Sequence, residues 1–279
     1  MPSVRYRRIG SALRQAREAA GLTIEAAARR YGRSPGWIST TENGLQPIRV
    51  DDLGDLLDFY KVQDPILRES LLHLARQGRK KNWEREFQNH VSAASLDLAS
   101  LEWDSSEICT FQPNLIPGLL QTPDYTRSLI AASLYDEDRR PDDFVRFRLA
   151  RQRVLSKAQP PNYVAVIGEA ALHQQVGSSE AMRTQLRQLR EAAQLSHITV
   201  RILPYSAGAH LWLTGPFDLF RLLPPGRLTV SVFELFKQSS FVEDPKEVAS
   251  HEQLFAHLLS GTLDEAHSLN VVDRILSTP

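Results

Sequence analysis

The sequence predicts an all-α N-terminal bundle of five helices, followed by a C-terminal mixed α/β (α+β) domain. Through residues 8–77, apolar residues recur at three- and four-residue steps, as expected for helices that bury one face. From about residue 105 onward, short β-rich segments alternate with helical ones, which indicates helices packed on one central sheet. A chain of 279 residues, of which 42% are hydrophobic, is long enough for two such domains.

Two short helices joined by a tight corner are predicted within the bundle. Thr23 can cap the first of them, and Gly32 then ends it. Ser34 can cap the second, Pro35 occupies its first position, and Gly44 follows its end. Two helices separated by about three residues have the geometry of a helix-turn-helix, whose second helix enters the major groove of DNA.

The N-terminal part is basic although the whole chain is neutral. Residues 1–81 hold 15 Lys and Arg against 9 Asp and Glu, whereas residues 82–279 hold 18 against 24. A basic helical bundle is expected to face nucleic acid, so double-stranded DNA is the predicted partner. The side chains expected to contact DNA phosphates are Arg5, Arg7, Arg8, Arg29, Arg30 and Arg33.

Two segments of the bundle resemble the Cro- and lambda-repressor-like (XRE-type) helix-turn-helix regulators. They are Leu13-Arg14-Gln15-Ala16-Arg17-Glu18-Ala19-Ala20-Gly21-Leu22-Thr23 and Ile38-Ser39-Thr40-Thr41-Glu42-Asn43-Gly44. The resemblance implies a structural ion pair between Arg17 and Glu42, which would lock the first helix to the third. It also implies a regulator that binds double-stranded DNA.

The base-reading positions of that family fall on Pro35, Gly36, Ser39 and Thr40, with Trp37 beside them. These side chains lack the long amides and arginines that grip base edges in relatives, so direct readout should be modest and supplemented by DNA shape. The full set of expected DNA-binding residues is Thr23, Arg29, Arg30, Arg33, Ser34, Pro35, Gly36, Trp37, Ser39, Thr40 and Asn43. Because one short recognition helix buries little surface, we expect a homodimer on a two-fold site.

The predicted domain order is a DNA-binding domain over 1–77, a linker or docking helix over 78–100 and an α/β domain over 101–279. Apolar residues at helical steps predict one helix from Trp83 to Leu98, which either docks two domains or subunits or packs on its own domain. Strands are predicted at 107–111, 162–168, 197–203, 217–222 and 228–235, and helices at 123–134, 142–157, 179–195 and 245–259, the last continuing in pieces toward residue 276.

A second resemblance covers roughly residues 100–276. Its segments are Asn114-Leu115-Ile116-Pro117-Gly118-Leu119-Leu120-Gln121-Thr122-Pro123-Asp124-Tyr125, Ile167-Gly168-Glu169-Ala170-Ala171-Leu172-His173 and Val200-Arg201-Ile202-Leu203-Pro204. They resemble the C-terminal domain, of unknown function, that is common in actinobacterial helix-turn-helix regulators. Genes of that group often sit beside genes for small partner proteins, in pairs compared with antitoxin and toxin. The resemblance implies that the C-terminal domain tunes DNA binding, and it favours control by a small partner protein. The alternative is a small molecule bound in a pocket of that domain.

Five residues of the C-terminal domain are candidates for a ligand or partner site. Tyr125 follows a Pro-Gly turn, which either shapes a pocket with Tyr125 at its rim or only directs the chain. Glu169 and His173 lie one helical turn apart and either bind a polar ligand or form a surface pair. His210 and Trp212 lie in a loop of small and aromatic residues, which either closes over a ligand or packs as an ordinary loop.

Several function classes are disfavoured by the sequence. No nucleophile elbow, glycine-rich phosphate loop or metal-ligand cluster is found, so we expect no enzyme and predict no catalytic residue, cofactor or metal. No apolar run approaches the roughly 20 residues that span a bilayer, and the N-terminus lacks the apolar core of a signal peptide. The single cysteine, Cys109, cannot form an internal disulfide. We therefore expect a cytoplasmic protein without a membrane partner.

Overall fold

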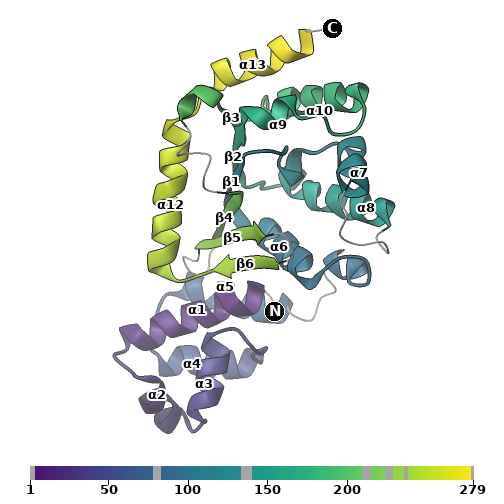
Figure 1. Ribbon diagram of the computed structural model, residues 1–279. Helices are drawn as coiled ribbons and strands as arrows, with labels where there is room; N and C mark the ends of the chain where they lie inside the picture. Colours follow the sequence, from purple (N-terminus) through teal and green to yellow (C-terminus); the bar gives the residue numbers. More distant parts are fainter. Residues whose placement is uncertain are drawn as a thin grey trace. The chain divides into compact units, whose positions relative to one another are not determined.

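A computed structural model of the chain describes residues 4–77, 83–132, 140–208, 215–223, 229–235 and 238–277 (Figure 1). The chain divides into two compact units. Unit 1 comprises Met1–Glu86, Ala93–Asp104 and Leu222–Leu228, and unit 2 comprises Phe87–Ser92, Ser105–Arg221 and Thr229–Pro279. The expected domain boundaries at residues 77 and 100 stay a prediction.

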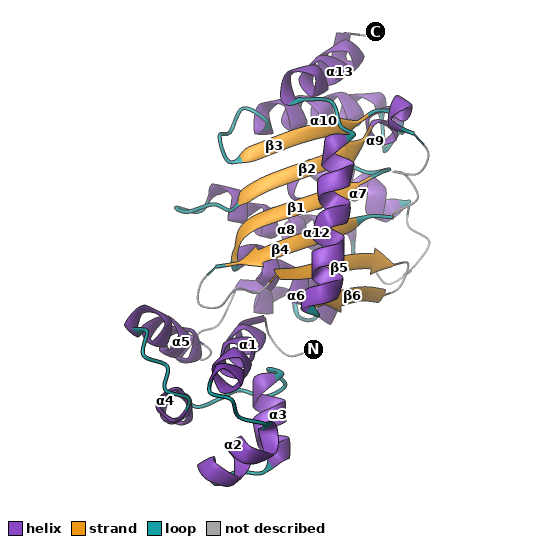
Figure 2. Ribbon diagram, turned by 90° about the vertical axis from the view of Figure 1, so that its left-hand side faces the viewer, coloured by secondary structure: helices purple, strands orange, loops and turns teal. Residues whose placement is uncertain are grey.

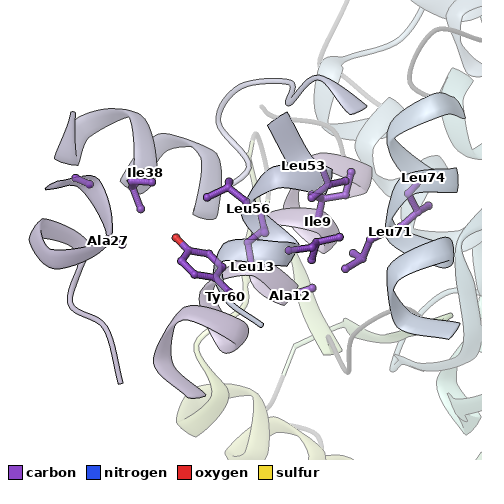
Figure 3. Close-up of a cluster of buried hydrophobic side chains, with 12 residues drawn as sticks. Ile9, Ala12, Leu13, Ala27, Ile38, Leu53, Leu56, Tyr60, Leu71 and Leu74 are labelled. Carbon is purple, nitrogen blue, oxygen red and sulfur yellow. The ribbon is translucent and has the colours of Figure 1, made fainter. Parts of the chain in front are cut away.

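Unit 1 contains the five predicted helices. They are α1 (Val4–Ala19), α2 (Ile24–Tyr31), α3 (Pro35–Glu42), α4 (Val50–Phe59) and α5 (Pro65–Gln77). Side chains from all five meet in one core, which Figure 3 shows in close-up. Its buried members are Ile9, Ala12, Leu13, Ala27, Ala28, Ile38, Leu53, Leu56, Leu57, Tyr60, Leu71 and Leu74. The predicted five-helix bundle is therefore confirmed.

The segment predicted as one helix from Trp83 to Leu98 is broken, so that prediction was wrong. Its pieces are the 3₁₀ helix η1 (Trp83–Phe87) and the helix α6 (Ala93–Trp103). The two aromatic residues that suggested a single apolar face pack against different partners. Trp83 lies beside Trp103, with ring centroids 6.4 Å apart, whereas Phe87 packs on Phe147 at 5.2 Å. Because these contacts belong to different units, Trp83 and Phe87 do not lie on one face of a continuous helix.

Unit 2 is built on a mixed sheet. Its strands are β1 (Ser105–Gln112), β2 (Asn162–Gly168), β3 (Ile198–Leu203), β4 (Phe217–Leu222), β5 (Thr229–Leu235) and β6 (Gln238–Val242). Within the described residues the strand order is β3-β2-β1-β4-β5-β6. β1, β2 and β3 run parallel, whereas β4, β5 and β6 pair antiparallel. This sheet confirms the predicted mixed α/β (α+β) class.

Helices cover both faces of the sheet. The remaining elements are η2 (Gly118–Leu120), α7 (Pro123–Ala131), α8 (Pro141–Gln152), η3 (Arg153–Ser156), α9 (Glu169–His173), α10 (Ser179–Ala192), η4 (Tyr205–Ala207), α12 (Pro245–Ser260) and α13 (Glu265–Ser277). Figure 2 shows α12 across one face and α7, α8 and α10 on the other. The chain crosses from β1 to β2 through α7 and α8, and from β2 to β3 through α10, as parallel strands require. Under α12, Phe217 meets Phe255 edge to face at 6.2 Å.

The segment that leads into α13 covers the free edge of β3, an outer strand of the sheet. Leu263 donates its N–H to the carbonyl of Ile202 at 2.9 Å, and the N–H of Ile202 donates to Ser268 Oγ at 2.9 Å. These bonds occupy backbone groups of an edge strand that would otherwise be open to pairing with another chain. The closing helices α12 and α13 match the predicted helix that continues in pieces. Throughout the described part of the chain, each helix is too short or too polar to span a bilayer.

Candidate nucleic-acid interface

The corner between α2 and α3 is fixed by local caps. Thr23 Oγ1 accepts a hydrogen bond from the N–H of Ala26 at 3.1 Å, where α2 begins. Gly32 ends α2 with φ +77°, a left-handed conformation that favours glycine. Ser34 Oγ accepts from the N–H of Trp37 at 3.1 Å and thereby begins α3. The predicted pair of capped helices, joined by three residues, is present.

A buried ion pair fastens α3 to α1. The Nε–H of Arg17 lies 2.9 Å from both carboxylate oxygens of Glu42, and both residues are buried. Tyr60 donates its hydroxyl to the same carboxylate at 3.2 Å, and Arg17 also donates to the carbonyl of Leu22 at 2.6 Å. Burial raises the pKa of the Glu42 carboxyl, and the neighbouring Arg17 opposes this shift. The contact implied by the family resemblance is thus part of the bundle core.

Two glycines let the backbones of α1 and the end of α3 touch. A Cβ on Gly10 would lie 2.4 Å from the carbonyl oxygen of Glu42, and a Cβ on Gly44 would lie 2.5 Å from the backbone nitrogen of Arg7. Gly44 also has φ +64°. Sequence reasoning used Gly44 only as a helix stop and did not single out Gly10, whose one signal is a glycine inside a helical pattern. The two glycines therefore allow the end of α3 to pack closely against α1.

The opposite side of α3 faces away from the bundle core. Ile38, Thr41 and Glu42 are buried. The residues predicted to read DNA are exposed or half-buried: Ser34, Pro35, Gly36, Asn43, Ser39 and Thr40. On a helix with 3.6 residues per turn, positions 35, 36, 39, 40 and 43 share one side. The helix therefore presents an uncharged polar surface of small side chains.

Hydrogen bonds within α3 limit what this surface can read. Thr40 donates its hydroxyl to the carbonyl of Gly36 at 2.8 Å, which leaves its methyl group for contacts with a thymine methyl. Asn43 donates from Nδ2 to Ser39 Oγ at 3.3 Å, so the Ser39 hydroxyl can still donate to a base. The exposed side of α3 thus offers few polar groups for contact with bases, and the modest direct readout expected from the sequence stays a prediction.

Arg33 and Trp37 form a cluster at the start of α3. The guanidinium of Arg33 lies 5.1 Å from the centre of the Trp37 ring and 3.1 Å from a carboxylate oxygen of Asp52. Trp37 is half-buried and stacks on Tyr31 at 6.1 Å. Asp52 therefore partly neutralises the charge of Arg33. Trp37 packs mainly against the bundle and is only partly exposed to solvent.

Of the predicted phosphate contacts, Arg29 and Arg30 are exposed on α2. Arg7 and Arg8 are buried, so their assignment to the DNA surface was wrong. The physical reason is that α6 packs on α1 within unit 1. Arg8 forms a 3.1 Å ion pair with Asp104 just beyond α6 and also donates to the carbonyl of Leu223. The side chain of Arg5 lies outside the described part of the structure.

Tyr125 is fully buried, which corrects its placement at the rim of a pocket. Its hydroxyl accepts a hydrogen bond from the N–H of Ile116 at 3.2 Å, inside the turn that precedes α7. Gln121 holds the same turn by donating to the carbonyl of Ile116 at 2.7 Å, and Arg148 donates to Gln121 at 2.7 Å. Burial raises the pKa of the Tyr125 hydroxyl. The segment before α7 is therefore a turn that directs the chain, the second of the two interpretations that the sequence allowed.

Glu169 and His173 lie at the carboxyl edge of the parallel strands, in the short helix α9 that follows β2. His173 Nε2 is 3.9 Å from a carboxylate oxygen of Glu169, whose other oxygen accepts from the N–H of Tyr205 at 2.9 Å. The rings of His173 and Tyr205 stack with centroids 6.4 Å apart. Sequence reasoning missed Tyr205, which is 59% exposed. His210 and Trp212 lie outside the described residues.

The capped corner, the anchored α3 and its exposed polar side define a helix-turn-helix DNA-binding domain, and the chain is a helix-turn-helix regulator. A family model described as "Helix-turn-helix domain" matches residues 8–71. A second model, described as "Domain of unknown function (DUF5753)", matches residues 96–274. Because the second match covers more than half of the chain, the protein belongs to the DUF5753 family. No match was found among curated proteins or among solved structures.

Proposed function

We propose that the protein is a sequence-specific transcriptional regulator of the XRE type that binds two-fold DNA sites as a homodimer. The observation that carries this proposal is the orientation of α3. Its buried side is fixed by Arg17 and Glu42, while its uncharged polar side is exposed. Arg29 and Arg30 are exposed on α2, the helix that packs against α3. A rigid helix with one exposed polar side can enter the major groove, and the arginines on α2 can contact the phosphates.

In this proposal the arginines of α2 and the polar residues of α3 make different kinds of contact with DNA. Arg29 and Arg30 supply attraction to any DNA, because phosphate contacts carry no base information. Ser39, Thr40 and Asn43 supply hydrogen-bond and methyl contacts to base edges. Since these contacts are few, the sequence-dependent shape of the DNA and the pairing of two subunits provide the rest of the specificity.

The C-terminal domain, in this proposal, controls DNA binding through a small partner protein, as in antitoxin-like pairs of actinobacterial regulators. Its role is binding and not catalysis, and the protein acts in the cytoplasm. The contact site we propose is the cluster of Glu169, His173 and Tyr205, where an exposed aromatic ring stands beside a carboxylate at the edge of the sheet. Control by a small molecule at the same edge is the second candidate, because ligands of open α/β sheets bind at the carboxyl ends of strands.

The proposal is tested by measuring the mass of the complex of the full-length protein with a selected DNA site. Two chains per site are expected, and one chain on a site without two-fold symmetry would contradict the homodimer. Adding the product of an adjacent small gene should change DNA affinity about tenfold or more, a coupling typical of two-site control. Loss of that effect in Tyr205→Ala would support the partner site, whereas no complex with the small protein would leave the small-molecule alternative.

A further inference from the structure

Unit 1 contains a groove of about 760 Å³, and no residue of α3 is among the described residues that line it. It lies between α1, the segment at Leu22 that leads into α2, Arg30 in the last turn of α2, and the turn from α4 to α5. Its floor is made of small residues of α1 such as Ala16, and its walls are Leu22, Phe59 and Val62. These side chains are half-buried, so the bundle leaves them partly uncovered. Small-molecule sites commonly have roughly 300–1,000 Å³ and a mostly apolar lining.

The charged residues of this groove are both cations. Arg30 of α2 and Lys61 of the α4–α5 turn line it, and neither Asp nor Glu occurs among the described residues that do so. Within the described part of the chain, no ion pair is formed by Arg30 or Lys61. Unneutralised cations beside an apolar surface attract a ligand with an anionic group and an apolar body.

Lys61 occupies a position that favours glycine. It follows α4 with φ +56°, the single positive φ of a non-glycine residue among the described residues. The N–H groups of Lys61 and Val62 bond to the carbonyls of Asp58 and Leu57 at 3.0 and 2.9 Å, which is the hydrogen-bond pattern of a helix end that usually carries glycine. A lysine held in a conformation unfavourable for its backbone points to a use for its ammonium group.

We propose that this groove binds a small organic acid, with its hydrocarbon body against α1, Leu22, Phe59 and Val62 and its carboxylate bound by Arg30 and Lys61. Gln15, the other exposed polar residue of the lining, can donate a further hydrogen bond to the ligand. Tyr60 contributes only its ring, because its hydroxyl is bonded to Glu42.

A ligand in this groove would also affect DNA binding, an expectation that rests on the proposed function. Arg30 is also a proposed phosphate contact, so an acid bound in the groove competes with DNA for the same guanidinium. Ligand binding should therefore weaken DNA binding and reduce its dependence on salt, because one phosphate contact is lost. The groove would then make the DNA-binding domain itself responsive to a metabolite.

Binding is tested by calorimetry of the DNA-free, full-length protein with hexanoate, octanoate and decanoate. We expect binding that strengthens with chain length, and much weaker binding of octanol and octylammonium, which lack the carboxylate. Arg30→Gln and Lys61→Gly should each weaken octanoate binding about tenfold or more, as loss of a charged hydrogen-bond partner does. Arg29→Gln is the matched control, because Arg29 is the exposed neighbour of Arg30 and does not line the groove.

Lys61→Gly separates a binding role from a structural one. Glycine relieves the left-handed backbone, so the melting temperature of this variant should be unchanged or higher while octanoate binding is weakened. No binding of any of the three acids, equal binding of octanol, or equal affinity in Lys61→Gly would overturn the proposal. Octanoate that binds the groove without displacing DNA would leave the site standing and contradict only the shared use of Arg30.

Discussion

Arg17 in α1 and Glu42 at the end of α3 share one N–H between two carboxylate oxygens, each 2.9 Å away, with Tyr60 donating to the same carboxylate. The pair lies behind the exposed face of α3, so it sets the orientation of the recognition helix without touching DNA. Gly10, packed against the carbonyl of Glu42, fixes the distance between the same two helices.

Glu42→Gln should lower the free energy of unfolding of unit 1 by about 3 kcal/mol, because Arg17 is then left as a buried charge without its main partner. The control is Arg14→Ala on the same helix, where the ion pair with Glu18 is exposed and the loss should be about 0.5 kcal/mol or less. Urea unfolding measures both variants. Equal losses in the two would show that the buried pair has no special role.

Gly36→Ala should separate stability from DNA binding. An alanine stabilises a helix by about 0.5–1 kcal/mol relative to glycine, and a Cβ at this position meets nothing closer than Ser34 Oγ at 3.9 Å. The melting temperature should rise slightly, while affinity for a selected site should fall because the added methyl separates α3 from the base edges. Fluorescence anisotropy gives the affinity, and an unchanged value would remove Gly36 from the interface.

Replacing Arg29 and Arg30 together with alanine should weaken binding to all DNA sequences alike. Each lost phosphate contact lowers the slope of log affinity against log salt by about 0.9 for duplex DNA. Arg190→Ala in α10, where Arg190 pairs with Asp273 at 2.9 Å, is the control and should leave the slope unchanged. A double variant with the wild-type slope would place the phosphate contacts elsewhere.

Tyr125→Phe should lower the stability of unit 2 by about 1–3 kcal/mol, because the buried N–H of Ile116 loses its acceptor. Tyr205→Phe is the same change at a tyrosine that is 59% exposed, where the loss of stability should be smaller. Thermal unfolding of the two variants makes the comparison. If Tyr125→Phe instead left stability intact and altered partner binding, the residue would belong to a binding site after all.

Cys109 should react slowly with thiol reagents in the folded protein. Partial burial, with a smaller effect of Glu107, raises the pKa of the Cys109 thiol to about 12, so little of the reactive thiolate is present at neutral pH. Alkylation by iodoacetamide in native buffer and in urea measures the difference. Because Cys109 is the single cysteine, the rate belongs to it alone. Comparable rates in both solvents would mean that the folded protein does not protect the half-buried thiol.

The sequence predicts the helix-turn-helix well because its determinants are local. Thr23, Gly32 and Ser34 each act within four residues, and the apolar steps of α1 and α4 specify their buried faces directly. The burial of Arg7 and Arg8 is different in kind, because it depends on α6, almost a hundred residues away in the chain. An arginine on a helix surface gives no sign of such a partner.

The same distinction holds in unit 2. β2 is recognisable from its own apolar run, whereas β6, Gln-Ser-Ser-Phe-Val, has no such pattern and is a strand because β5 pairs with it. Tyr125 looks like a pocket residue in sequence because the turn that covers it is rich in Pro and Gly. The turn is held by Gln121, which lies within it, and by Arg148, which reaches it from α8.

The most direct measurement is selection of bound fragments from genomic DNA by the purified full-length protein at near-physiological salt. We expect a two-fold motif, with half-sites about 34 Å apart on one face of the duplex, and a changed sequence preference in Ser39→Ala. Binding that is sensitive to salt but recovers no motif would contradict sequence-specific recognition by α3.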